Sequence, residues 1–375
     1  MLLVRAVQRP VKEKANPPYT SHRFIFQDAG RLRELAAESI DLVVTSPPYP
    51  MIQMWDEHFS RADARVALGL EKGDGDTAFE LMHRQLDRVW EELARVMKKG
   101  SFVCINIGDA TRRIGNRFQL FANHARVLSK FSRLGFDPLP LILWRKQVNA
   151  PNKFMGSGML PAGAYVTLEH EYILIFRKGP RRTFPSAEEK ERRRQSALFW
   201  EERNVWYSDL WDFKGTRQNT GGEGVRERSA AYPLVLPFRL INMYSLLGDT
   251  VLDPFLGTGT TALAALAAGR NSIGFELEAS FSRTIRERMQ REFSLLAELN
   301  RRRVADHLAF IKKCRQEGRS LKYRNEPFGF PVMTGQETGL KLPFLRRLEE
   351  EEAGLWKAYY HDDAYLKEVA LRCTP

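Results

Sequence analysis

Residues Thr45-Ser46-Pro47-Pro48-Tyr49-Pro50 form the stretch from which the fold can be worked out. They follow Ser39–Val44, a short run with β-branched residues that predicts a buried strand. Two consecutive prolines end that strand, remove two backbone donors and stiffen the turn. The sequence therefore predicts a rigid turn at the carboxyl end of a strand. In open α/β sheets, that edge is where ligands bind.

The same stretch suits one kind of chemistry. The exocyclic amino group of a nucleobase is a poor nucleophile, because its lone pair is delocalised into the ring. The Ser46 hydroxyl and the Pro47 carbonyl could accept its two N–H groups and localise that lone pair, while the Tyr49 ring stacks on the base. A plain surface turn that merely ends a strand fits these residues too, since proline pairs are common turn formers.

Composition limits the class of protein. The chain has 375 residues, 43% of them hydrophobic, and a net charge of +12, which favours a polyanionic partner, nucleic acid before a membrane surface. Its three cysteines, Cys104, Cys314 and Cys373, form no CxxC pair, which argues against a disulfide scaffold or a structural zinc site. We expect no signal peptide, and the sequence contains no apolar run long enough to span a bilayer. We expect a cytoplasmic protein without a metal.

A second stretch of interest begins at Thr250–Asp253, which reads as a strand. It runs into Pro254-Phe255-Leu256-Gly257-Thr258-Gly259-Thr260-Thr261, an Ala/Leu-rich helix that ends at Gly269, and a strand, Asn271–Phe275, with Glu276 at its tip. This order resembles the nucleoside-binding unit of doubly wound folds, in which glycines allow close backbone approach and an acid accepts from ribose hydroxyls. The stretch is not GxGxxG and lacks a GKS or GKT phosphate loop, so a nucleoside without phosphate fits better. An ordinary βαβ turn has the same spacing.

Strands and helices alternate along much of the chain, which predicts an α/β fold with a doubly wound, mostly parallel sheet. Residues 50–78 are irregular, either a mobile loop over the site or a surface excursion. The further expected strands are Phe24–Phe26, Ser101–Ile107, Pro140–Trp144 and Glu171–Phe176. The further expected helices are Arg31–Glu38, Phe79–Met97, Phe118–Leu134 and Pro233–Ser245.

Residues 177–228 differ in composition. Arg177–Arg194 carries eight Lys or Arg against three Asp or Glu, and six aromatic residues follow: Phe199, Trp200, Trp206, Tyr207, Trp211 and Phe213. Basic charge mixed with aromatic rings is typical of a nucleic-acid surface. A solvated helix beside a small satellite core is the alternative. From Ala279 onward the chain is charged and reads as helical, with Glu349–Glu352 as a solvated helix face.

Thr45–Tyr49 and Asp253–Thr261 together resemble the amino-methyltransferases of DNA in the permuted order called β, in which the catalytic half precedes the cofactor half. Three further stretches are similar to this family: Asp28 after Phe26-Gln27, Glu171–Lys178, and Tyr232-Pro233 with Leu236-Pro237. The resemblance covers roughly residues 20–290. It implies a Rossmann-like domain that binds S-adenosyl-L-methionine and acts on double-stranded DNA.

The resemblance also implies an organisation of the chain and its site. We expect an N-terminal arm (1–20), a catalytic half (21–176), an inserted target-recognition region (177–228), a cofactor-binding half (229–290) and a helical C-terminal extension (291–375). The implied catalytic residues are Ser46, Pro47, Pro48 and Tyr49. The implied cofactor-binding residues are Asp28, Asp253, Phe255, Gly257, Thr258, Gly259, Thr260 and Glu276. A prokaryotic or phage source, a partner restriction endonuclease and a homodimer also fit the family.

Ser46 decides the finer assignment. In this family Ser-Pro-Pro-Tyr usually accompanies methylation of cytosine N4, whereas Asp- or Asn-Pro-Pro-Tyr usually accompanies adenine N6, so cytosine is favoured and adenine stays open. Cytosine C5 chemistry needs a thiolate nucleophile, conventionally after a proline, and no cysteine here follows one. A catalytically inactive DNA-binding protein and a methyltransferase acting on RNA or protein are the remaining alternatives. The recognition sequence cannot be read from the chain.

Overall fold

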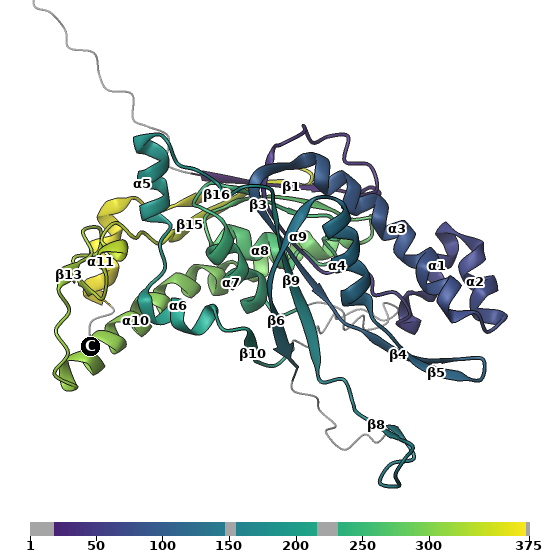
Figure 1. Ribbon diagram of the computed structural model, residues 1–375. Helices are drawn as coiled ribbons and strands as arrows, with labels where there is room; N and C mark the ends of the chain where they lie inside the picture. Colours follow the sequence, from purple (N-terminus) through teal and green to yellow (C-terminus); the bar gives the residue numbers. More distant parts are fainter. Residues whose placement is uncertain (1–18, 147–154, 216–231, 373–375) are drawn as a thin grey trace, which may run out of the picture.

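A ten-stranded sheet runs through the centre of the molecule in a computed structural model that describes residues 19–146, 155–215 and 232–372 (Figure 1). The strand order is β10-β6-β9-β3-β2-β11-β12-β1-β16-β15. The neighbouring strands β3, β2, β11, β12 and β1 are mutually parallel. Antiparallel pairs flank this parallel centre on both sides, β9 with β3 and β16 with β1. The predicted α/β fold with a mostly parallel central sheet is confirmed.

The sheet strands follow the chain in alternation with helices. Their bounds are β1 (Tyr19–Ile25), β2 (Ile40–Thr45), β3 (Met97–Ile107), β6 (Phe136–Arg145), β9 (His170–Lys178), β10 (Leu210–Asp212), β11 (Thr250–Asp253), β12 (Asn271–Phe275), β15 (Leu345–Glu352) and β16 (Leu355–Tyr360). The described short strands outside the sheet are β4 (Ala110–Ile114), β5 (Arg117–Phe121), β7 (Met155–Gly156), β8 (Ala164–Tyr165), β13 (Tyr323–Arg324) and β14 (Pro331–Val332).

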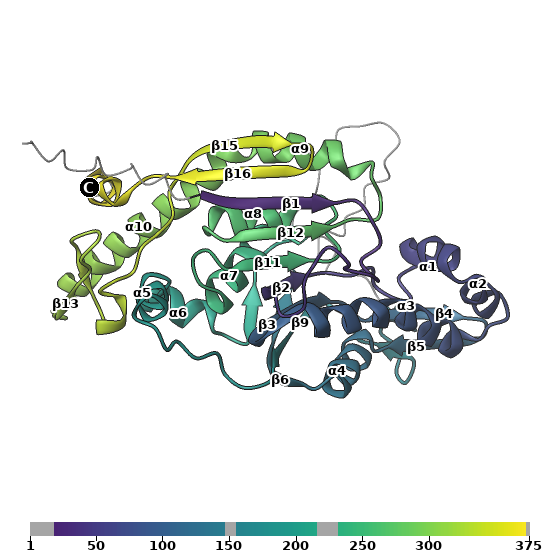
Figure 2. The same cartoon turned by 90° about the horizontal axis from the view of Figure 1, so that it is seen from above.

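Helices cover both faces of the sheet, as Figure 2 shows from above. The bounds of the α-helices are α1 (Asp56–Ala62), α2 (Ala64–Glu71), α3 (Gly75–Val96), α4 (Asn123–Arg133), α5 (Ala187–Gln195), α6 (Trp200–Trp206), α7 (Val235–Tyr244), α8 (Thr260–Ala267), α9 (Phe281–Arg291), α10 (Phe293–Gln316) and α11 (Asp363–Arg372). Side chains of α3 and α4 form one core with one face of the sheet, and those of α7 and α8 form a second core with the other. Helix α8 is buried along its whole length, which explains its Ala/Leu composition.

Two predicted helices are wrong in whole or in part. Residues 31–38 form turns, because α3 satisfies their backbone groups: Arg95 donates to the Leu32 and Leu35 carbonyls, and Glu92 accepts from the Leu32 N–H. The helix expected over 118–134 begins only at Asn123, since residues 117–121 pair with β4 in a hairpin. The irregular loop expected over 50–78 contains the helices α1 and α2.

The C-terminal extension is helical only in part. After α10 the chain returns to the sheet, where β16 pairs with β1 and β15 forms the edge. The acidic run Glu349–Glu352 therefore lies on an edge strand, and the expected helix face is wrong. Charged side chains on an edge strand hinder pairing with another chain, which gives this run a physical reason. Most of the expected N-terminal arm lies outside the described residues, and Tyr19 and Thr20 begin β1.

The described part of the segment 177–228 starts at the opposite end of the sheet from the Thr45–Pro50 turn. Arg182 binds Asp249 just before β11, and α5 and α6 follow at this end. The chain returns toward the carboxyl ends of the strands only at β10, which pairs with Leu143–Arg145 of β6. Of the six aromatic residues, Phe199, Trp206 and Trp211 are buried in the cores. Residues 216–228 of this segment lie outside the described residues.

Candidate active site

The Thr45–Pro50 turn and the glycine turn after β11 meet at one edge of the sheet. Strands β2 and β11 are parallel neighbours, with Leu42 opposite Val251 and Val43 opposite Leu252, so their carboxyl ends lie side by side. The Thr45 hydroxyl donates to Asp253 Oδ1 over 2.6 Å and joins the two turns directly. Two sequence stretches about two hundred residues apart thus form one site.

Asp253 is the buried centre of this junction. Besides Thr45, its carboxylate accepts from the Thr261 hydroxyl at 2.5 Å and from the Phe255 N–H at 3.1 Å. The Tyr232 hydroxyl contacts Thr261 from the other side. Burial raises the pKa of the Asp253 carboxyl, and hydrogen bonds from Thr261 and Thr45 offset part of that rise. Asp253 therefore holds the two turns together and has few free lone pairs for a ligand.

A cavity of about 850 Å³ opens over the junction. Of the twelve site residues expected from the sequence, all except Gly259 line it. Its far wall comes from the 3-10 helix Gln53–Trp55, α1 and α3, whose side chains include Trp55, His58, Arg84 and Arg88. The segment expected as a mobile loop thus contributes a helical wall. Figure 1 shows α1, α2 and α3 extending from this side of the sheet.

The glycine turn shapes the cofactor side of the cavity. Gly257 has φ +53° and Gly259 has φ +86°, which are left-handed conformations that favour glycine. The Gly257 N–H donates to Glu276 Oε2 at 2.7 Å, and the Glu278 N–H donates to Glu276 Oε1 at 2.9 Å. Burial raises the pKa of Glu276, while these two backbone donors lower it. Glu276 is thereby fixed at the tip of β12, half-buried beside the turn.

The other expected cofactor residues differ in their surroundings. Asp28 is exposed, accepts from the Gly30 N–H at 2.9 Å and lies 3.4 Å from the Arg88 guanidinium. Thr258 and Thr260 accept from Arg288 of α9, at 2.7 Å and 3.1 Å between hydroxyl oxygen and Nη1. Their hydroxyls therefore help to dock α9. Phe255 lies edge-on to Trp90, with ring centroids 5.8 Å apart.

A hydrogen-bond network fixes the catalytic side. The Tyr49 hydroxyl donates to Glu171 Oε2 over 2.9 Å, and Asn106 Nδ2 donates to the same tyrosine oxygen at 2.8 Å and to Glu171 at 2.6 Å. Lys146 Nζ donates to the other Glu171 oxygen. Burial, and then the Glu171 carboxylate, raise the pKa of Tyr49 well above its ordinary value, so the hydroxyl keeps its proton.

This network determines the direction of the bond at Ser46. Ser46 Oγ lies 3.1 Å from the Tyr49 hydroxyl, whose own proton is directed to Glu171. The Ser46 hydroxyl therefore donates to Tyr49, which leaves its oxygen lone pairs free to accept from a ligand. Sequence reasoning did not single out Glu171, Asn106 or Lys146. Glu171 lies at the start of β9, Asn106 near the end of β3 and Lys146 just after β6. Polar residues at strand ends that meet at this edge of the sheet are the sequence signal that could have identified them.

Residues 40–287 match a family model described as DNA methylase, of the N6 and N4 methyltransferase type. The chain belongs to the DNA methylase family. One relative is the Type II methyltransferase M.MthZI of Methanothermobacter thermautotrophicus. It is 48% identical over 345 residues, which cover 92% of this chain and 96% of that protein. The Type II methyltransferase M.MjaI of Methanocaldococcus jannaschii is 47% identical over 281 residues, or 72% of this chain and 91% of that protein.

A solved structure supports the same membership. TTHA0409 of Thermus thermophilus, described as a DNA modification methylase and solved in complex with S-adenosyl-L-methionine, matches with a TM-score of 0.54 and 32% identity over 72% of this chain and 95% of that one. This DNA methylase is thus a β-class DNA amino-methyltransferase that uses S-adenosyl-L-methionine. The cavity beside Gly257 and Glu276 offers a nucleoside both close backbone approach and a carboxylate acceptor. No helix among the described residues is long and apolar enough to cross a membrane.

Proposed function

We propose that this protein transfers a methyl group to the exocyclic N4 amino group of a cytosine in duplex DNA. The observation that carries the proposal is the orientation of Ser46, whose oxygen is left free to accept by the Tyr49–Glu171 network and lines the same cavity as the glycine turn. The residue before Pro-Pro-Tyr is Ser46 rather than Asp or Asn, and this favours cytosine over adenine as the target base.

S-Adenosyl-L-methionine supplies the electrophilic methyl group when bound. We assign its ribose hydroxyls to Glu276, its adenosine side to Asp28 and Phe255, and its close contact with the backbone to Gly257. Thr258, Gly259 and Thr260 form the turn into α8 that keeps this surface in place. Asp253 holds that turn next to Ser46 through the Thr45 hydroxyl.

The target base has to leave the helical stack, because its amino nitrogen cannot reach a methyl donor inside a duplex. Tyr49 stacks on the extruded ring, and its hydroxyl bond to Glu171 fixes the ring plane. Ser46 Oγ and the Pro47 carbonyl accept the two amino hydrogens. As the bond between the methyl carbon and the amino nitrogen forms, the methyl–sulfur bond of S-adenosyl-L-methionine breaks and S-adenosyl-L-homocysteine is the leaving group. The amino nitrogen gives up one proton, for which the hydrogen-bonded path from Ser46 through Tyr49 leads to the Glu171 carboxylate. Positioning supplies much of the rate.

We further propose that the duplex is contacted by the chain between β6 and β9. Lys146 at the end of β6 and Glu171 at the start of β9 both line the cavity, and the described part of their connection forms the projecting β7–β8 hairpin (Figure 1). Its side chains Met159, Tyr165 and Val166 are exposed. In this proposal the connection between β6 and β9 takes the place of residues 177–212 of the expected target-recognition region, because those residues lie mostly at the other end of the sheet.

A cellular role follows from the relatives, both of which are named Type II methyltransferases. We propose that this enzyme protects DNA from a partner restriction endonuclease. The homodimer and the cytoplasmic location stay predictions.

The test is mass spectrometry of nucleosides from DNA incubated with the purified protein and S-adenosyl-L-methionine that carries a deuterated methyl group. The proposal expects labelled N4-methylcytosine. Labelled N6-methyladenine would move the assignment to adenine, and label in RNA or protein acceptors alone would overturn the DNA substrate. Unmethylated DNA, with cofactor binding intact, would favour an inactive DNA-binding protein.

A further inference from the structure

A second cavity, of about 1050 Å³, lies at the end of the sheet opposite the active site. It is lined by Asp41 at the start of β2 and by Gly100 and Ser101 in the first half of β3, together with residues of α5, of α6, and of the end of α7 and the chain after it. Ser46 lies five positions after Asp41 along the extended chain of β2, which places these two lining residues about 17 Å apart. We call this second cavity the basic cleft.

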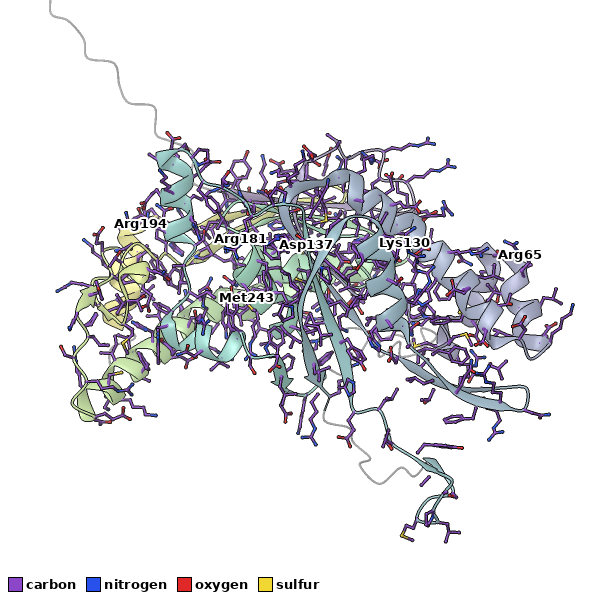
Figure 3. The ribbon with its side chains drawn as sticks, viewed as in Figure 1. Arg65, Lys130, Asp137, Arg181, Arg194 and Met243 are labelled. Carbon is purple, nitrogen blue, oxygen red and sulfur yellow. The ribbon has the colours of Figure 1, made fainter. Side chains whose placement is uncertain are left out.

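The basic cleft has a strong excess of positive charge. Two acidic residues line it, Asp41 and Glu337. The cationic lining residues are Arg177, Arg181, Arg182, Lys190, Arg193, Arg194 and Arg203. Figure 3 labels three of the residues that line the cleft, Arg181, Arg194 and Met243.

Part of this charge is not neutralised by the protein. Arg177, Arg182 and Arg194 pair with Asp137, Asp249 and Glu191. Within residues 19–146, 155–215 and 232–372, no carboxylate lies within 4.0 Å of the side-chain nitrogens of Arg181, Lys190, Arg193 or Arg203. Such a group of unpaired cations repels itself, and an anionic ligand would relieve that repulsion.

The cleft is held in a fixed shape. Asp249, nearly inaccessible just before β11, accepts from Arg182 at 2.6 Å and lies 3.3 Å from Arg192, so two arginines tie α5 and the loop before it to the sheet. Arg193 packs over the Phe184 ring, with its guanidinium carbon Cζ 4.7 Å from the ring centroid. The rings of Trp200 and Tyr207 also line the cleft and are partly exposed, 36% and 44%. Cations mixed with accessible aromatic rings suit the phosphates and sugars of a nucleic acid.

We propose that the basic cleft binds the phosphate backbone of a second stretch of DNA, outside the duplex that occupies the active site. The proposal rests on DNA being the substrate, and it gives the composition of Arg177–Arg194 a function other than reading the target sequence. A contact of this kind is independent of base sequence and depends strongly on salt. It would hold the enzyme on long DNA between turnovers without taking part in methyl transfer.

The test compares two double variants by fluorescence anisotropy on a 60-base-pair duplex over a range of salt concentrations. Arg181→Gln/Arg193→Gln removes two unpaired cations from the cleft. Arg302→Gln/Arg315→Gln removes two exposed arginines of α10, which are outside the cleft lining, and serves as the control. Log affinity falls with log salt concentration, and loss of two phosphate contacts makes this slope less steep by about 1.8.

We expect that reduction for the cleft variant alone, with an unchanged turnover number on a duplex just long enough for the active site. Equal slopes for the cleft variant, the control and the wild type would overturn the proposal. A second outcome would overturn it too: the cleft variant loses the wild type's binding to poly-glutamate but keeps the wild-type DNA slope. That result would assign the cleft to an acidic protein. Nucleoside mass spectrometry separately reports whether the proposed methylation occurs, so failure of one proposal is distinguishable from failure of the other.

Discussion

Replacing Glu171 by glutamine tests whether the carboxylate behind Tyr49 aligns the catalytic turn. Glutamine has nearly the same shape, but its amide nitrogen has to face one of the three donors that now meet the carboxylate, Tyr49, Asn106 or Lys146. A hydrogen bond to a charged group contributes about 1.5–3 kcal/mol. Because the Lys146 side chain is 37% exposed, solvent screens its share, and we take the lower part of that range, ~1.5–2 kcal/mol.

Through lost alignment alone, that free energy corresponds to a roughly 10- to 30-fold lower rate of methyl transfer, and loss of the carboxylate that accepts the proton lowers the rate further. The rate is measured in a single turnover with tritiated S-adenosyl-L-methionine, and cofactor affinity is measured separately by calorimetry. Since Glu171 is on the base side of the cavity, we expect the dissociation constant of the cofactor to stay within about two-fold.

The matched control is Glu91→Gln, which changes an exposed carboxylate of α3 that lies 2.6 Å from Lys130 and outside the proposed DNA contact. It should leave the rate unchanged. A wild-type rate for Glu171→Gln would remove the carboxylate from the mechanism. An equal loss of cofactor affinity would indicate a general structural role.

Three further predictions concern other parts of the chain. Ser46→Ala should leave cofactor binding nearly intact and lower the single-turnover rate by about 10-fold or more, since the alanine cannot accept the amino hydrogen; an unchanged rate would exclude Ser46. Gly259→Ala, at φ +86°, should cost about 1–2 kcal/mol of unfolding free energy in urea, whereas no loss would mean that the turn relaxes freely. Burial lowers the pKa of His22 to about 3, so stability is full above pH 6.5 and falls as pH decreases toward 3. Between pH 6.5 and 5.0 the wild type should lose about 1.6 kcal/mol more than His22→Gln, and parallel losses would contradict the assignment.

Local sequence signals were sufficient to predict the strands at the centre of the fold and the turns that follow them. The strands before Ser46 and before Pro254 are short, apolar and ended by proline, and these features do not depend on distant contacts. The parallel pairing of β2 with β11 then brings the two turns together, as Thr45 and Asp253 demonstrate.

Long-range contacts decided the features that the sequence did not predict. The positions of α5 and its arginines depend on Asp249, more than fifty residues later in the chain. Residues 31–38 have helical composition, yet Glu92 and Arg95 of α3 take over their backbone hydrogen bonds. The strand at Glu349–Glu352 exists because β16 pairs with β1 and offers β15 an edge. Asp249, α3 and β1 are distant in sequence from the segments that they position, whereas β15 and β16 are neighbours joined by the short turn at Ala353-Gly354.

The most direct test of the account is a crystal structure of the protein with its DNA and a non-reactive analogue of S-adenosyl-L-methionine. The account predicts an extruded cytosine whose N4 lies within hydrogen-bond distance of Ser46 Oγ and the Pro47 carbonyl, with the analogue's ribose on Glu276. A target base that stays stacked in the duplex, or an analogue bound away from the Gly257 turn, would contradict it.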